Sequence, residues 1–294
     1  MHHCAIKAIR FAGLADATIH TLPMDDQFRM TPEALARQIR EDRQEGLQPF
    51  MIFASAGTTD IGAVDPLQKL ADVAEEHDLW FHVDAAYGAA FMLTGHGKEK
   101  LSGIDRADSV IIDPHKGLFL PYGSGALLVR DGQKLYASQH MKANYLQDTY
   151  DATGEYSPAD MSPELSKHFR GLRMWLPLKL FGVKPFRAAL DEKLLLTRYF
   201  YQEVQNIPGM EVGPEPELSV SLFRYLPDSG DPNTFNKKLV DAIHEDGRVF
   251  LSSTHIEETI YLRMAILGFR THKKQVDLVL EVLKEKIGEI KTVS

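Results

Sequence analysis

The segment from residue 79 to residue 88 constrains the fold of this chain more than any other stretch. Its first five residues, Leu-Trp-Phe-His-Val, are mostly apolar, aromatic or β-branched and predict a short buried strand. The strand ends in a carboxylate, Asp84, and small residues that favour a turn follow it. Because ligands bind at the carboxyl ends of strands in open α/β sheets, we expect Asp84 to face a ligand.

A second predicted strand, residues 109–112, ends in Asp113, Pro114, His115 and Lys116. Lys116 follows Asp84 by 32 residues (116 − 84), so two strands of one sheet would end in an acid and in a histidine–lysine pair. A pyridoxal phosphate site needs a lysine that forms an imine and a carboxylate that faces the pyridinium nitrogen. The two strand ends therefore predict such a site.

The elements around these two strands predict an α/β fold with a mostly parallel sheet. Residues 31–46 are typical of a helix, residues 49–56 of a buried strand, and a further helix is expected to begin at Asp65-Pro66. Strands joined through helices in this way run parallel. Residues 123–130 are expected to pair with the strand at 109–112 as its return.

Composition limits the classes of partner. The 294 residues carry 33 basic and 41 acidic side chains, a net charge of −8 without a basic run, so neither nucleic acid nor an anionic membrane is an expected partner. Cys4 is the only cysteine, and no apolar stretch reaches the length of a membrane span. These features favour a cytoplasmic protein without an intrachain disulfide.

The second half of the chain predicts a different architecture. Residues 137–163 lack apolar periodicity and are expected to form a long loop, followed by a helix from about Pro163 with a kink at Pro177 and a helix over 184–206. The predicted elements after Pro208-Gly209 are strand 217–226, helix 232–246, strands 248–255 and 259–267, and helix 272–290. We therefore expect a large domain over residues 1–206 and a small α+β domain over 207–294.

Two motifs together carry a family resemblance: His-Val-Asp-Ala-Ala-Tyr at residues 82–87 and Asp-Pro-His-Lys at 113–116. With them the chain resembles the pyridoxal-phosphate-dependent group II amino acid decarboxylases, which include aromatic amino acid and glutamate decarboxylases. The resemblance extends from His2 to about Ile287. It implies the aspartate aminotransferase-like fold (fold type I), a homodimer, and conversion of an L-amino acid, here expected to be aromatic, to its amine and carbon dioxide.

The resemblance also implies roles for residues around the cofactor ring. Lys116 matches the lysine of the internal aldimine, and His115 matches the adjacent histidine near the phosphate. Asp84 matches the aspartate paired with the pyridine nitrogen. Ala86 matches the small residue on one face of the ring, and His2 matches the histidine stacked on the other face. An imidazole in that place could also relay a proton.

Three further positions concern the ring edge and the substrate. Thr59 matches a threonine beside the ring, and Arg263 resembles the arginine that holds the substrate carboxylate. Family members have a tyrosine in a catalytic loop that protonates the carbanion. Tyr156 is our choice for that tyrosine and Tyr150 is the alternative. No metal site is expected.

The chain departs from the family in two ways. Family members carry a long region ahead of the position of His2, with a helical segment of the dimer, part of the substrate pocket and the first strands of the large domain. This region is absent here, so we expect an incomplete large domain. Gly117 stands where many relatives have a bulky side chain, which bears on the shape of the pocket.

Other interpretations stay open at this point. Taken singly, Lys116 could be a solvated lysine, Asp84 a turn or cap residue, His2 a surface histidine and Arg263 a member of an ion pair. The same imine chemistry could instead serve amine-to-aldehyde conversion, transamination or carbon–sulfur cleavage. A further alternative is that the chain is a non-catalytic fragment that only dimerises.

Overall fold

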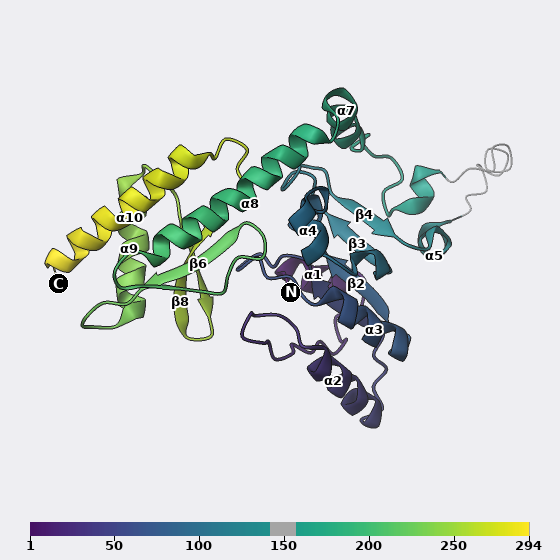
Figure 1. Ribbon diagram of the computed structural model, residues 1–294. Coiled ribbons are helices and arrows are strands. Elements are labelled where there is room, and N and C mark those ends of the chain that lie inside the picture. Colours follow the sequence, from purple (N-terminus) through teal and green to yellow (C-terminus); the bar gives the residue numbers. More distant parts are fainter. Residues whose placement is uncertain (142–156, 294) are drawn as a thin grey trace.

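The computed structural model describes residues 1–141 and 157–293, and within them the chain forms two four-stranded sheets joined by a long helix (Figure 1). The sheet orders are β1-β2-β3-β4 and β5-β6-β8-β7. This is an α/β fold, as expected, in which the first sheet is mixed and largely parallel and the second is antiparallel.

The first sheet contains the strands that the sequence analysis placed at its centre. Strand β1 (Met51–Ser55) pairs in parallel with β2 (Trp80–Asp84), which pairs in parallel with β3 (Ser109–Ile112). Strand β4 (Ala126–Val129) returns antiparallel to β3. The predicted parallel arrangement and the predicted return strand are both confirmed.

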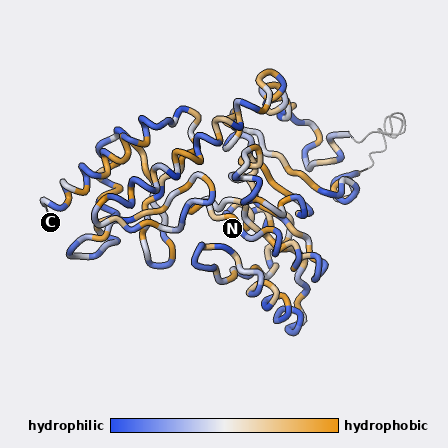
Figure 2. The backbone as a smooth tube through the Cα atoms, viewed as in Figure 1, coloured by the Kyte–Doolittle hydropathy of each residue, from blue (hydrophilic) through white to orange (hydrophobic). Residues whose placement is uncertain are grey.

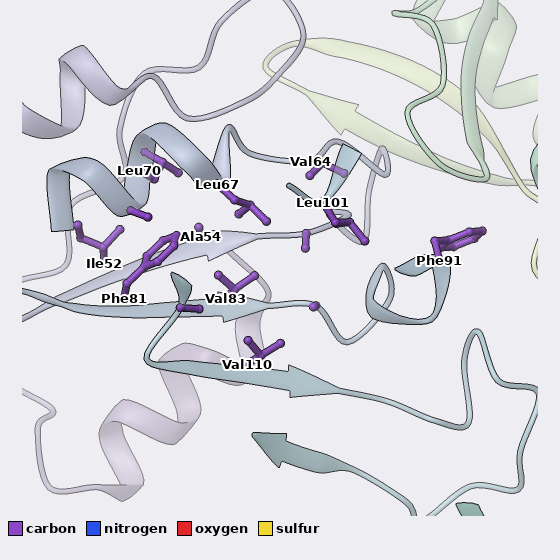
Figure 3. Packing of buried hydrophobic residues seen from close by; sticks show 14 of the residues in the cluster. Ile52, Ala54, Val64, Leu67, Leu70, Phe81, Val83, Phe91, Leu101 and Val110 are labelled. Carbon is purple, nitrogen blue, oxygen red and sulfur yellow. The ribbon is translucent and has the colours of Figure 1, made fainter. Parts of the chain in front are cut away.

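Helix α3 (Leu67–His77) covers one face of this sheet because its apolar stripe meets the apolar side of β2. Leu67 and Leu70 lie above Phe81 and Val83, and all four side chains are buried (Figure 3). Successive strand residues point to opposite faces, so Trp80, His82 and Asp84 lie on the other face of β2, where they are only half-buried. One face of β2 thus builds the core, and the other carries the candidate chemistry.

Seven further helices precede α7 in the described part of the chain. They are α1 (His3–Phe11), α2 (Pro32–Gln44), η1 (Ala89–Leu93), α4 (Gly95–Lys100), η2 (Ile104–Arg106), α5 (Gly132–Gln139) and η3 (Pro158–Met161). The buried carboxylate of Asp65 accepts hydrogen bonds from the backbone N–H groups of Ser55 (2.7 Å) and Met30 (2.8 Å). It therefore ties the segment that follows β1 to the segment ahead of α2.

The predicted helix from Pro163 is wrong in its start. Helix α7 (Leu172–Phe181) begins nine residues later (172 − 163), although Pro177 does lie inside it. The physical reason is a missing packing surface: the side chains of Leu165 and Phe169 are 67% and 77% exposed, and an amphipathic helix gains most of its stability from packing of its apolar face. The predicted loop over 137–163 is interrupted by the end of α5 and by η3, and residues 142–156 lie outside the described part.

Helix α8 (Lys184–Gln205) matches its prediction and runs from α7 along the second sheet (Figure 1). Leu190 and Leu194 belong to the hydrophobic core of the first sheet, whereas Phe200 and Val204 belong to that of the second. One helix thus contributes to both cores. The division at residues 206 and 207 stays a prediction.

The second sheet consists of β5 (Met210–Val212), β6 (Val220–Tyr225), β8 (Thr259–Ala265) and β7 (Ser252–Ile256), with helices α9 (Pro232–Asp246) and α10 (Lys273–Val293). Strands β6, β7 and β8 and both helices were predicted, but β5 was not. The tube coloured by hydropathy shows the usual alternation of apolar and polar stripes along α8 and α10 (Figure 2).

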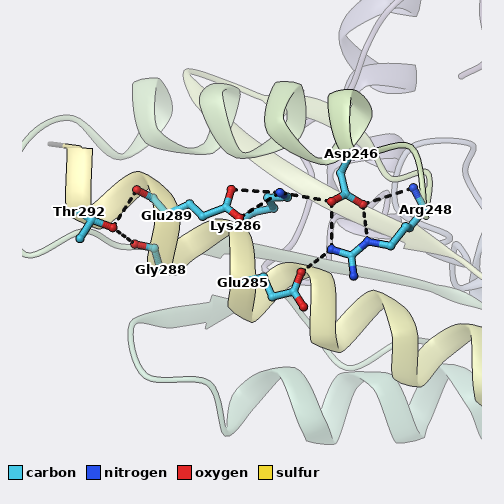
Figure 4. Close-up of polar contacts among 7 residues, drawn as sticks. All are labelled: Asp246, Arg248, Glu285, Lys286, Gly288, Glu289 and Thr292. Carbon is cyan, nitrogen blue, oxygen red and sulfur yellow. Dashed lines mark hydrogen bonds and ion pairs between the residues drawn. The ribbon is translucent and has the colours of Figure 1, made fainter.

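Figure 4 shows the polar contacts that join the end of α9 to α10. The Arg248 guanidinium donates to Asp246 Oδ1 from Nε (2.7 Å) and also pairs with Glu285, while Lys286 Nζ lies 3.2 Å from Asp246 Oδ2. The Arg248 hydrogen bond holds the pKa of the Asp246 carboxyl below its usual range. Arg248 and Glu285 are exposed, so the contribution of their ion pair to stability is small.

Candidate active site

The carboxyl ends of β2 and β3 lie side by side because the two strands are parallel and in register. Asp84 is opposite Ile111, and the hydrogen bonds continue beyond the paired residues. The N–H of Ala85 donates to the Ile111 carbonyl (3.1 Å), and the N–H of Asp113 donates to the Ala86 carbonyl (3.3 Å). The segments that carry Asp84 and Lys116 are thus brought together, as the sequence predicted.

Lys116 lies in a tight turn that begins at Asp113. Its backbone N–H donates to the Asp113 carbonyl (2.9 Å), which closes the turn. Its Nζ also lies 2.9 Å from Asp113 Oδ2. The Lys116 side chain is 37% exposed and can therefore be reached from solvent. Its amine is at the same time held by one carboxylate, that of Asp113. The role of Asp113 was not predicted from the sequence, although its place three residues before Lys116 was a usable signal.

His115 lies between the same carboxylate and the loop that leads to β4. Its Nδ1 is 3.3 Å from the Ser124 carbonyl oxygen, to which a protonated Nδ1 donates. Its Nε2 is 3.9 Å from Asp113 Oδ2, and its ring lies 4.9 Å from that of Tyr122. The imidazole is therefore held from three sides beside Lys116.

Asp84 and Ala86 form the other half of the cluster. Asp84 Oδ1 accepts a hydrogen bond from the N–H of Ala86 (3.1 Å), an Asx-type turn that fixes the carboxylate at the strand end. Two residues back on the same face, His82 Nδ1 lies 2.7 Å from Ser109 Oγ. Burial lowers the pKa of His82, and the charge of Asp84 opposes that shift.

Thr59 and Arg263 meet through the backbone of the loop that follows β1. Arg263, on β8 of the second sheet, donates from Nη2 to the Thr59 carbonyl (2.5 Å) and from Nε to the Asp60 carbonyl (2.7 Å). Its Nη1 donates to Ser252 Oγ (3.0 Å). Burial lowers the pKa of the guanidinium, and the charge of Asp60 opposes that shift. Three of its five N–H donors are thus engaged within the chain.

Tyr87 makes a second contact between the two sheets, which the sequence analysis missed. Its hydroxyl lies 2.5 Å from Ser219 Oγ and accepts from the N–H of Ser219 (3.1 Å). Burial raises the pKa of the Tyr87 hydroxyl to about 12. Nearby, the N–H of Val64 donates to Glu217 Oε2 (2.7 Å). Tyr87 therefore fastens the segment after β2, and Val64 the segment after β1, to the residues just ahead of β6.

Among residues 1–141 and 157–293, His2 makes no hydrogen bond or ring contact with this cluster. His2 is the N-cap of α1: its Nδ1 accepts from the N–H of Cys4 (3.3 Å), and its ring lies 4.1 Å from that of His3. Its stacking role stays a prediction. Tyr156 and Tyr150 lie outside the described residues.

Gly117 is buried against η1. A Cβ at this position would lie 2.5 Å from the Cβ of Ala90, so a bulky residue here would require Ala90 to move. The small size of Gly117 and Ala90 therefore allows the residue after Lys116 to pack closely against η1.

The donor set suits pyridoxal phosphate. One strand end supplies a primary amine and an imidazole, and its neighbour supplies a carboxylate and a small residue, Ala86, the combination that this cofactor requires. A metal is a poorer match: among residues 1–141 and 157–293, no cluster of three or more histidine, cysteine or acidic side chains could hold one.

Comparison with known proteins gives the same class. Residues 1–226 match the family described as "Pyridoxal-dependent decarboxylase conserved domain". An aromatic-L-amino-acid decarboxylase from Bacillus atrophaeus is 36% identical over 294 residues, which cover 98% of this chain and 61% of the relative. A cysteine sulfinic acid decarboxylase from Mus musculus is 38% identical over 232 residues, 78% of this chain and 47% of the relative.

Solved structures agree in fold. The Oryza sativa enzyme TDC, solved with PLP and tryptamine, superposes with a TM-score of 0.92 at 27% identity and covers 99% of this chain and 61% of its own. Mouse CSAD in apo form superposes with a TM-score of 0.86 at 29% identity, and the match covers 97% of this chain and 62% of the CSAD chain. The fold and the site define a fold type I pyridoxal-phosphate protein. The chain belongs to the pyridoxal-dependent decarboxylase family and spans about 60% of the length of most of these relatives.

Proposed function

We propose that this chain carries the cofactor site of an enzyme that decarboxylates an L-amino acid to the corresponding amine and carbon dioxide. The observation that carries the proposal is the pairing of two strand ends, one with Asp84 and the other with Lys116, in a member of the pyridoxal-dependent decarboxylase family. Because the chain covers 61% of the Bacillus relative, activity of the isolated chain is part of what must be tested.

The cofactor would be pyridoxal phosphate, which when bound supplies the electron sink for the carbanion that loss of carbon dioxide leaves behind. Lys116 would supply the amine that binds it covalently. The Asp84 carboxylate would face the ring nitrogen and keep it protonated. His115 would lie toward the phosphate, and Ala86 would leave room for one face of the ring.

The remaining roles concern the other ring face, the substrate and the proton. We propose that His2 stacks on the ring, that Thr59 lies beside it, and that Arg263 binds the substrate carboxylate with the donors that its three contacts leave over. Tyr156, outside the described residues, is the proposed proton donor to the carbanion.

We propose an aromatic substrate. The Bacillus relative is named for aromatic amino acids and is 36% identical, and a Catharanthus roseus tryptophan decarboxylase solved with L-tryptophan has a TM-score of 0.87 at 26% identity. The cysteine sulfinic acid relative, at 38% identity over a shorter region, makes an acidic amino acid the alternative. Selectivity depends on side chains that line the pocket, so product analysis must decide between the two.

The assembly, domain division and location that we propose follow the family and the composition. A homodimer is supported by large apolar side chains that are exposed in the single chain, such as Phe181 and Trp175 of α7 and Leu128 of β4. The separate cores of the two sheets support a cofactor domain over residues 1–206 and a small domain over 207–294. The single cysteine supports a cytoplasmic location. None of the helices within 1–141 and 157–293 has the length and apolarity for a bilayer crossing.

The test is an absorbance spectrum of the purified chain with pyridoxal phosphate, followed by borohydride reduction and peptide mass spectrometry. We expect a visible band and cofactor attached to Lys116, and neither in Lys116→Ala. Lys273→Ala is the matched control, since Lys273 is a salt-bridged lysine at the start of α10. A band that survives in Lys116→Ala would overturn the assignment. Release of carbon dioxide from a panel of aromatic and acidic amino acids then tests the reaction and the substrate class.

A further inference from the structure

The carboxylate of Asp113 is the closest acidic partner that the structure gives the Lys116 amine, at 2.9 Å. The backbone of Asp113 is anchored on both sides: its N–H donates to the Ala86 carbonyl, and its carbonyl accepts from the N–H of Lys116. The side chain of Asp113 is 21% exposed. A fixed backbone and a half-buried carboxylate place the negative charge at a defined point beside the amine.

Other titratable and charged groups lie on the segments next to this pair. His115 Nε2 approaches the same Oδ2 atom at 3.9 Å, and Asp84 lies at the end of the neighbouring strand. His115 packs against the ring of Tyr122, and the Tyr122 carbonyl accepts a hydrogen bond from the Arg173 guanidinium (2.8 Å). Among the ion pairs of the described residues, the one that involves Lys116 is with Asp113.

We propose that Asp113 is a positioning residue that holds the Lys116 ammonium at the strand end and accepts its proton when the lysine reacts. This inference rests on the proposed role of Lys116. With pyridoxal phosphate bound, the Lys116 ammonium would pass one proton to the Asp113 carboxylate, and the freed amine would bond to the aldehyde carbon of the cofactor. The aldehyde oxygen would leave as water with the two remaining nitrogen protons. When a substrate amine displaces the lysine, the Asp113 carboxylic acid would return its proton to the released Lys116 amine, which restores the ion pair.

The ion pair can be tested without cofactor, because acetic anhydride acetylates a free amine and not an ammonium. In Asp113→Asn, we expect Lys116 to be acetylated about threefold faster than in the wild type, a size set by the modest strength of a partly exposed ion pair. Asp113→Glu keeps a carboxylate within reach and should restore the slow rate. If the faster acetylation came from a disturbed fold and not from the lost charge, Asp113→Asn and Asp113→Glu would both show it.

A matched control uses a second lysine. Lys273 Nζ lies 2.8 Å from Asp277 Oδ1, so Asp277→Asn should accelerate acetylation of Lys273 and leave Lys116 unchanged. An unchanged Lys116 rate in Asp113→Asn, with a response at Lys273 in Asp277→Asn, would overturn the proposal.

Borohydride capture of pyridoxal phosphate, measured in parallel, separates this inference from the function on which it rests. Wild-type capture at Lys116 with no effect of Asp113→Asn on acetylation would refute the role of Asp113 alone. A failure of capture in the wild type would refute the role of Lys116, and with it the proton transfer, even if acetylation shows the ion pair.

Discussion

The strand-end cluster and the contact between the two sheets are built in opposite ways. In the cluster, Asp113 and Lys116 belong to one turn, and strand register brings them beside Asp84. Between the sheets, Arg263 binds the Thr59 carbonyl 204 residues away, and the Tyr87 hydroxyl meets Ser219 across 132 residues. The first region depends on local sequence and one sheet, whereas the second depends on how two sheets dock. Mutations should therefore affect the two regions differently.

The largest expected effect comes from the core beneath the cluster. Phe81 is 1% exposed between β2 and α3, so Phe81→Ala should lower the free energy of unfolding by about 3–5 kcal/mol. Chemical denaturation would measure the loss. Leu239→Ala, in the core of the second sheet, is the matched control: we expect it to cost stability while leaving cofactor capture at Lys116 in the folded protein intact. A Phe81→Ala protein of wild-type stability would contradict the role of this core.

A smaller effect is expected from the Tyr87 hydroxyl at high pH. An unfolded tyrosine loses its proton near pH 10, whereas burial raises the pKa of Tyr87 to about 12 in the folded chain. The folded state then holds a proton that the unfolded state has lost. The stabilisation is complete below pH 10 and is lost as the pH rises from 10 to 12, by about 2–3 kcal/mol for two pKa units.

Denaturation curves between pH 9 and 12 would measure this loss. Tyr87→Phe should show a shallower decline, because it has no proton to lose at this position. Equal slopes in the two proteins would show that Tyr87 does not carry the alkaline sensitivity. Tyr261→Phe, on β8, is a suitable control for tyrosines in general.

The smallest effect on stability is expected from Arg263→Gln, which removes the hydrogen bonds to the Thr59 and Asp60 carbonyls. Because the guanidinium is only partly buried, we expect a loss of about 1.5 kcal/mol. A more decisive measurement compares the effect of Arg263→Gln on the KM for substrate with its effect on the affinity for cofactor. A residue that only joins the sheets should weaken cofactor binding through Thr59, whereas a substrate anchor should raise KM and leave cofactor affinity unchanged. Arg224→Gln, paired with Glu211 on the same sheet, is the control.

Much of the first sheet and part of the site could be predicted from sequence. The strands that end at Asp84 and Ile112 have short apolar runs with clear turn signals, and parallel pairing follows from the helices between them. The proximity of Asp84 and Lys116 follows from that pairing. The family was predicted from motifs that are local in sequence, at residues 82–87 and 113–116, and the match to the family model over residues 1–226 confirmed it.

Other features had no local signal. Strand β5 has three residues and exists because it pairs with β6. Helix α7 starts later than predicted because Leu165 and Phe169, in its predicted first turns, are exposed and gain no stability from packing. The engaged donors of Arg263 and the contact of Tyr87 with Ser219 depend on the docking of the second sheet.

The sequence by itself determined the alternation of strands and helices, the identity of the residues at the two strand ends, and the family. The tertiary structure decided that Asp113 is the partner of Lys116, that Gly117 fits against Ala90, and that Arg263 reaches the loop of Thr59. The reason is physical: periodicity and turn chemistry act over a few residues and leave a trace in the sequence. Side-chain partners across the fold depend on distances that only packing sets.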